Sequence, residues 1–159
     1  MRAPDPVAVA YADMLSAQPW HWFCTLTFRP QHEGKLGGVG FEKADKAYRW
    51  FVKQINADLW GNNWKRKPHG GLVWARGQEF HKSGRIHFHA VMASPVGDLN
   101  EVAGRYRWHE FWYREFGRNQ IERPNSQSDV LDYVSKYVTK DGEVDFSPNF
   151  GQVLPPALF

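Results

Sequence analysis

The chain has almost no cysteine and no long hydrophobic run. Its single thiol, Cys24, excludes an intramolecular disulfide and fits a reducing compartment. Because Cys24 lies inside a strand-like pattern, we interpret it as a small core residue. No apolar run approaches the roughly 20 residues that a membrane-spanning helix needs. Residues 1–6 lead directly into a mixed segment, so neither a signal peptide nor a membrane partner is expected, and a cytoplasmic location is predicted.

An excess of charge of one sign is also missing. The formal net charge is only +3, which permits an anionic partner without requiring one. Aromatic residues are frequent at 16%, with eight tryptophans, and flat rings beside basic residues suit stacking on unpaired bases. The chain shows no internal repeat or low-complexity tract. Its 159 residues, 42% of them hydrophobic, predict one globular domain over residues 1–159.

Hydrophobic periodicity predicts an alternation of helices and strands. A helix over residues 100–116 is expected to be capped by Asn100 and stopped by Gly117, and Ser126 or Ser128 is expected to cap the last helix. The expected elements are a helix over 5–17, a strand over 20–28, a loop over 34–40, a helix over 41–59, a basic loop over 61–71, a hairpin over 72–92 turning at 82–84, a helix over 100–116, a strand over 119–122, a helix over 129–140 and an irregular tail over 141–159 that packs on the sheet or on a ligand.

The core order of strand, helix, strand, strand, helix, strand predicts an α+β fold. It is typical of a ferredoxin-like or RNA-recognition-like sandwich, in which helices cover one face of an antiparallel sheet. The second hairpin strand alternates two histidines with an apolar set, and we expect that set to face the helices. The histidines would then lie on the other, open face. The apolar set is Ile86, Phe88, Ala90 and Met92.

The hairpin carries the first group of chemically active residues. Successive strand residues point to opposite faces, so His87 and His89 share a face. A turn centred near Ser83 would place Glu79 opposite His87 on that face. Two imidazoles and a carboxylate make a plausible three-ligand site for a divalent cation with open positions. The alternative is a histidine pair on a strand that binds no metal.

The last helix carries the second group. Tyr133 and Tyr137 are four residues apart and lie on one flank of the helix, with Lys136 and Lys140 on the same side. The alternative reading is two amphipathic tyrosines at the edge of the core. A phenol, with a pKa near 10, is a poor nucleophile at neutral pH. A divalent ion that polarises a phosphodiester makes its attack feasible, and a nearby lysine adds electrostatic stabilisation.

Three motifs together resemble the HUH endonucleases, which include rolling-circle replication initiators, relaxases and related transposases. They are FCTLTF at residues 23–28, His87-Phe88-His89, and YVSKY at residues 133–137. The paired tyrosines and the tract EFHKSGRIHFH look most like the gene A initiators of small single-stranded DNA phages. The resemblance spans roughly residues 22–140, and it is specific as a set of motifs.

The resemblance implies a metal-dependent site. His87 and His89 would bind Mg²⁺ or Mn²⁺, with Glu79 as the third ligand and His81 as the alternative for that third place. It also implies that Tyr133 attacks a scissile phosphate of single-stranded DNA. The products would be a 5′-phosphotyrosine link and a free 3′-OH that starts rolling-circle replication.

Further roles follow from the same resemblance. Tyr137 would act in a later strand transfer, Lys136 would contact the phosphate, and Lys140 is a substitute for it. The expected DNA partner is an origin hairpin or nick site, with a host helicase or polymerase as further partners, in a bacterial or archaeal host of a phage or plasmid. The short chain leaves no room for a helicase domain, so it is a minimal protein or an excised nuclease domain. Predicted DNA contacts are Trp64, Lys65, Arg66, Lys67, Arg105 and Arg107.

Other readings compete with this one. A relaxase or a transposase would use the same chemistry. A non-catalytic module could bind single strands on the same sandwich through aromatic rings, without needing the histidines and tyrosines together. A two-histidine phosphoesterase requires two histidine-bearing tetrads, and only one such strand is present. A structural zinc site is disfavoured because Cys24 lies far from the histidines in the sequence.

Overall fold

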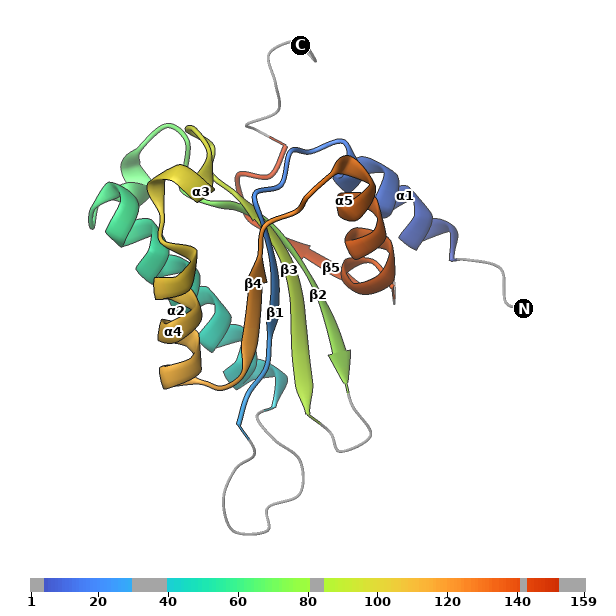
Figure 1. Ribbon diagram of the computed structural model, residues 1–159, viewed down its shortest axis with the longest axis horizontal. Coiled ribbons are helices and arrows are strands. Elements are labelled where there is room, and N and C mark those ends of the chain that lie inside the picture. Colours follow the sequence, from blue (N-terminus) through green and yellow to red (C-terminus); the bar gives the residue numbers. More distant parts are fainter. Residues whose placement is uncertain (1–4, 30–39, 81–84, 141–142, 152–159) are drawn as a thin grey trace.

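The computed structural model describes residues 5–29, 40–80, 85–140 and 143–151. It shows a five-stranded antiparallel sheet in the order β4-β1-β3-β2-β5, with helices on both faces (Figure 1). No helix in these ranges is long and apolar enough to cross a membrane. The strands are β1 (Trp22–Leu26), β2 (Val73–Phe80), β3 (Ile86–Ala93), β4 (Asn119–Glu122) and β5 (Val144–Phe146). The helices are α1 (Pro6–Ser16), α2 (Phe41–Trp60), α3 (Leu99–Val102), α4 (Arg105–Glu115) and α5 (Gln127–Tyr133), with a 3₁₀ turn, η1 (Trp64–Arg66), and a π-helical turn, η2 (Val134–Val138).

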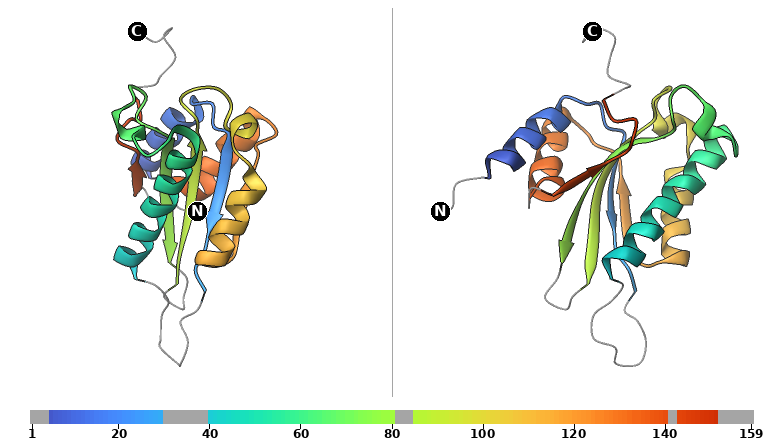
Figure 2. Two further views of the ribbon diagram at one scale, coloured as in Figure 1. Left: turned by 90° about the vertical axis from the view of Figure 1, so that its left-hand side faces the viewer. Right: turned by 180° about the vertical axis from the view of Figure 1, so that it is seen from behind.

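The predicted ferredoxin-like sandwich is confirmed. Strands β4-β1-β3-β2 have the strand order of that fold, and α2 and α4 connect them. Both helices lie against the same side of the sheet, as the two views in Figure 2 show. The apolar set of β3 faces them as expected: Phe88 and Met92 are fully buried against Tyr48 and Phe51 of α2. Aromatic rings meet edge-on in this core, for example Phe51 and Trp112 at 5.1 Å between centroids.

The second face of the sheet is not open along its whole length, which corrects the prediction. Figure 1 shows α1 and α5 against the side opposite α2 and α4. Strand residues on that side, including Phe23, Val73 and Val91, are apolar and would be exposed without this cover. Leu15 of α1 and Val134 of η2 pack on them and are fully buried. The histidines lie beyond this second cluster, toward the hairpin end of the sheet.

Two further boundaries differ from the predictions. The helix expected over 100–116 is two helices, because Ala103 takes an extended conformation before Gly104, and Asp98 rather than Asn100 caps the first of them. The tail expected to be irregular contributes β5, which pairs with β2 and adds a fifth strand. The turn at 82–84 and most of the loop at 34–40 lie outside the described residues.

One charged side chain lies inside the helix-covered face. Arg76 of β2 has a side chain only 2% exposed, and its guanidinium lies 2.7 Å from Asp45 and 3.5 Å from Asp145. It also lies 4.2 Å from the centre of the Phe88 ring, over its face. Burial alone would raise the pKa of the Asp45 carboxyl, but hydrogen bonds with Arg76 and Arg49 outweigh it and hold that pKa below its ordinary value. This network joins α2, β2 and β5.

Candidate active site

The register of β2 and β3 assembles the first group of predicted residues. Glu79 is the direct cross-strand partner of His87, as the sequence predicted. His89 pairs with Gly77 and projects from the same face as His87. The carboxylate oxygen Oε1 of Glu79 lies 3.9 Å from Nε2 of His89. The two imidazoles and the carboxylate therefore gather at one end of the hairpin, on the face away from α2 and α4.

The second group reaches the same place through a short helix. Ser126 caps α5, and its hydroxyl accepts a hydrogen bond from Asp129 N at 3.1 Å. Val130, Val134 and Val138 then form the buried stripe. The predicted continuous helix instead widens into η2 after Tyr133, and Thr139 N donates to the Val134 carbonyl at 2.9 Å. Such π-type turns are frequent at functional sites.

A glycine allows this helix to lie directly on the sheet. A Cβ atom at Gly77 would overlap the backbone carbonyl of Val138. Gly77 is also the cross-strand partner of His89. The backbones of η2 and β2 therefore approach each other beside a predicted metal ligand. Any side chain at position 77 would push the tyrosines away from the histidines.

Tyr137 lies directly on His89. The two rings stack with centroids 4.7 Å apart and planes 29° apart, and the Tyr137 side chain remains 42% exposed. His89 itself is buried, and its Nδ1 lies 3.5 Å from the Thr25 hydroxyl of β1. His89 thus connects the sheet to the exposed tyrosine.

Tyr133 is held more tightly. Its phenol donates a hydrogen bond to the Cys24 carbonyl at 2.7 Å and lies 3.1 Å from the Thr25 hydroxyl. Its ring stacks on Phe23 at 4.4 Å, nearly parallel. Burial raises the pKa of the Tyr133 phenol well above its ordinary value. The two tyrosines, whose ring centroids are 5.1 Å apart, therefore have different surroundings.

The two predicted lysines also differ in their surroundings. The ammonium of Lys140 lies 3.2 Å from Oε2 of Glu79, so it belongs to the site. Lys136 is exposed and forms no ion pair within the described residues. Of the two residues expected at the phosphate, Lys140 is the one that contacts a predicted ligand here.

The predicted DNA contacts lie elsewhere. Trp64, Lys65 and Arg66 form η1, which follows α2 on the helix-covered side of the sheet, and Lys67 follows that turn. On α4, Arg105 donates to the Ile121 carbonyl, and Arg107 pairs with Asp58 of α2 at 2.9 Å. These six residues are therefore remote from the tyrosines in the fold. Their role in DNA binding stays a prediction.

Sequence reasoning missed the part that β1 plays. Thr25 contacts both His89 and Tyr133, and a cavity of about 340 Å³ opens beside it toward β4. Its other lining residues include His109 and Tyr113 of α4 and Arg118. The pairing of β1 with both β3 and β4 creates this cavity, so no local motif signals it.

The donor set fits a divalent cation in its chemistry. Glu79, His87 and His89 supply oxygen and imidazole ligands on one face, which Mn²⁺ and Mg²⁺ sites can use. Within the described ranges, no three side chains of this kind are already gathered tightly enough to hold an ion, and the Lys140 ammonium lies against Glu79. Binding would require Glu79 to exchange that ion pair for the metal. His81, the alternative ligand, lies outside the described residues.

Comparison with known proteins adds a family. The profile of the replication-associated protein ORF2 family matches residues 21–142, which include the first-strand motif, both histidines and both tyrosines. No curated protein and no solved structure gave a significant match. The matched segment covers most of the 159-residue chain and supports a Rep-like replication initiator. The chain therefore belongs to the replication-associated protein ORF2 family.

Proposed function

We propose that the chain is an HUH-type endonuclease and strand transferase that nicks single-stranded DNA at an origin and starts rolling-circle replication. The observation that carries this proposal is the stacking of Tyr137 on His89 at 4.7 Å, beside Glu79 and Lys140. A potential nucleophile, a potential metal ligand and a cation thus occupy one exposed place. Membership of a replication-associated family gives this arrangement a DNA substrate.

The reaction is a transesterification. A tyrosine oxygen attacks the scissile phosphorus, a new P–O bond to tyrosine forms, and the bond to the 3′ oxygen breaks. The phenolic proton passes to solvent, and the leaving 3′ oxygen takes up a proton to become the free 3′-OH. When bound at Glu79, His87 and His89, Mg²⁺ or Mn²⁺ would polarise the phosphodiester and stabilise its developing charge. The phosphodiester is conserved in the enzyme link, so rejoining needs no ATP.

The two tyrosines would act in a fixed order. Tyr137 is exposed beside His89, whereas the Tyr133 phenol is bonded to the Cys24 carbonyl and its pKa is raised. A nucleophile must reach the phosphate and lose its proton. We therefore assign the first attack to Tyr137 and the later transfer to Tyr133, after its phenol leaves Cys24. This order reverses the one that the tyrosine motif suggested.

A denaturing-gel assay tests the proposal. The full chain is incubated with labelled single-stranded oligonucleotides from its replicon and Mn²⁺, with and without a chelator. We expect a slow-migrating covalent adduct that disappears with chelator and in the Tyr133→Phe/Tyr137→Phe double variant. Binding without any adduct on these oligonucleotides would replace the nuclease by a non-catalytic single-strand-binding module.

A further inference from the structure

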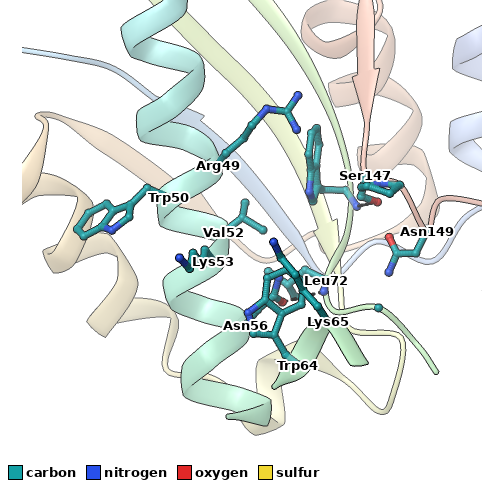
Figure 3. A pocket seen from close by; sticks show the side chains of 13 residues that line it. Arg49, Trp50, Val52, Lys53, Asn56, Trp64, Lys65, Leu72, Ser147 and Asn149 are labelled. Carbon is teal, nitrogen blue, oxygen red and sulfur yellow. Dashed lines mark hydrogen bonds between the residues drawn. The ribbon is translucent and has the colours of Figure 1, made fainter. Parts of the chain in front are cut away.

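A second cavity lies on the face of the sheet away from the tyrosines. It has a volume of about 640 Å³, which is within the range of pockets that hold small ligands or single nucleotides. Figure 3 shows its lining side chains coming from α2, from η1 and the start of β2, and from the segment after β5. Neither the metal ligands nor the tyrosines contribute to it. The proposed nicking reaction leaves this cavity unexplained.

Aromatic and cationic groups face this cavity together. Trp74 lies buried in its wall and Trp64 is partly exposed at its rim. The ammonium of Lys65 lies 5.6 Å from the centre of the Trp64 ring. Lys53 and Lys65 form no ion pair within the described part of the chain, and no carboxylate in those ranges lines the cavity. Flat rings and unneutralised ammonium groups suit an anionic ligand with an aromatic ring.

The back of the cavity is a fixed polar wall. Asn149 is 6% exposed, and its amide NH₂ donates to the His69 and Gly71 carbonyls, both at 2.8 Å. Its Oδ1 is buried and accepts no hydrogen bond from the residues that the structure describes. Asn56 is also buried, and its Oδ1 accepts from Leu72 N at 2.8 Å. The Asn149 amide orientation is thus set by two backbone carbonyls, and its oxygen is left as an acceptor that lines the cavity (Figure 3).

An unused acceptor in this position selects a ligand that donates a hydrogen bond. A buried acceptor without a partner costs free energy, and a donor on the ligand removes that cost. The exocyclic amino groups of cytosine and adenine are such donors, and thymine has none. Lys53 and Lys65 can neutralise the phosphate attached to such a base.

We propose that this cavity binds one unstacked nucleotide of single-stranded DNA, with a preference for a base that carries an exocyclic amine. The nucleotide would lie across the sheet from the nicked phosphate, so the bound strand must pass an edge of the sheet. The inference rests on the proposed function only in taking DNA as the partner. It assigns a second place of contact, independent of cleavage.

Fluorescence anisotropy tests the inference on the Tyr133→Phe/Tyr137→Phe chain without metal, so that cleavage plays no part. The probes are fluorescein-labelled dC20, dT20 and a 20-base-pair duplex. We expect dC20 to bind more tightly than dT20. Adding Trp64→Leu should weaken dC20 binding about tenfold, because stacking on one base is lost, and leave duplex binding unchanged. Lys53→Gln and Lys65→Gln should each lower the salt slope by about 0.7.

Matched controls separate the cavity from general effects. Lys46 is exposed on the same helix as Lys53, and Tyr106 is the most exposed aromatic residue of α4; neither lines the cavity. Lys46→Gln and Tyr106→Leu should bind dC20 with unchanged affinity. Circular dichroism confirms that each variant is folded. Equal losses in the controls, or wild-type dC20 binding by Trp64→Leu, would overturn the inference.

Photo-crosslinking locates the nucleotide directly. A dC20 strand carrying one 5-iodocytosine should crosslink to the peptide that contains Trp64 or to the one that contains Trp74. Crosslinks confined to the Tyr133 and Tyr137 peptide would contradict the inference while leaving the nuclease intact. Conversely, a Trp64 crosslink on a chain that never forms an adduct would contradict the nuclease and retain the cavity.

Discussion

The ammonium of Lys140 lies 3.2 Å from Oε2 of Glu79, the carboxylate whose other oxygen is 3.9 Å from His89. A cation of the chain thus stands beside the carboxylate that we propose as a metal ligand. Metal binding must break this ion pair, and it frees the ammonium near the exposed Tyr137. Lys140 would then be available to a phosphate only after the metal has bound.

Removal of this competing cation should strengthen metal binding. We expect Lys140→Gln to bind Mn²⁺ about two- to fivefold more tightly, because an exposed ion pair contributes up to about 1 kcal/mol. Isothermal titration calorimetry on the chain without DNA measures it. Lys136→Gln, which removes an exposed lysine with no ion pair in the described ranges, is the control and should leave the affinity unchanged. Weaker Mn²⁺ binding by Lys140→Gln would show that Lys140 does not compete with the ion.

The tyrosines should differ in single variants. Tyr137→Phe should slow adduct formation by about a hundredfold or more, the scale on which loss of a nucleophile acts. Tyr133→Phe should still form the adduct and fail to transfer the strand to a second oligonucleotide. Time courses on denaturing gels with two differently labelled strands separate these steps. The opposite pattern would assign the first attack to Tyr133.

Contact between Gly77 and Val138 makes the site sensitive to a single methyl group. Gly77→Ala should lower the free energy of unfolding by about 1–3 kcal/mol, as overpacking does, because the new Cβ meets a backbone carbonyl. Adduct formation should fall as well, since η2 moves away from His89. Urea unfolding measures the stability. Gly40→Ala is the control, since no atom of the described residues lies within 4 Å of its Cβ, and a similar loss there would remove the special role of Gly77.

The Arg76 network predicts how stability depends on pH. Asp45→Asn should destabilise the fold by about 2 kcal/mol at neutral pH, in the range for a hydrogen bond to a charged group. The pKa of Asp45 is lower in the folded chain than its ordinary value of 3.8. Its contribution is therefore complete above pH 3.8 and is lost as pH falls through the folded pKa. Thermal unfolding of both chains from neutral pH down to strongly acidic pH should show the difference shrinking only at the acid end; a constant difference would contradict this.

Local patterns were enough to predict most of the fold. The alternation in residues 72–92 predicts β2, β3 and the pairing of Glu79 with His87, because strand periodicity and a short turn fix the register. The stripe in residues 41–59 predicts α2. The break at Ala103 was not predicted, since the aromatic stripe of α4 runs on from α3 without a proline. The edge strand β5 was missed because its three residues gain their order by pairing with β2.

The site was predictable in its residue types and less so in its contacts. Spacing alone places the two tyrosines on one flank and the two histidines on one face. It does not show that Tyr133 is bonded to the Cys24 carbonyl, since that contact joins residues 109 positions apart. The choice of Lys140 over Lys136 likewise depends on where η2 crosses β2. Long-range packing decides these contacts, and no local pattern carries them.

The most direct measurement is the chemical identity of the protein–DNA link. The adduct formed with Mn²⁺ is digested with protease and nuclease, and the modified peptide is sequenced by mass spectrometry. We predict a nucleotide 5′-phosphate on Tyr137 or, after transfer, on Tyr133, together with a released strand whose 3′-OH a polymerase can extend. A released strand with no peptide-linked phosphate, or a phosphate on any other residue, would contradict the central claim.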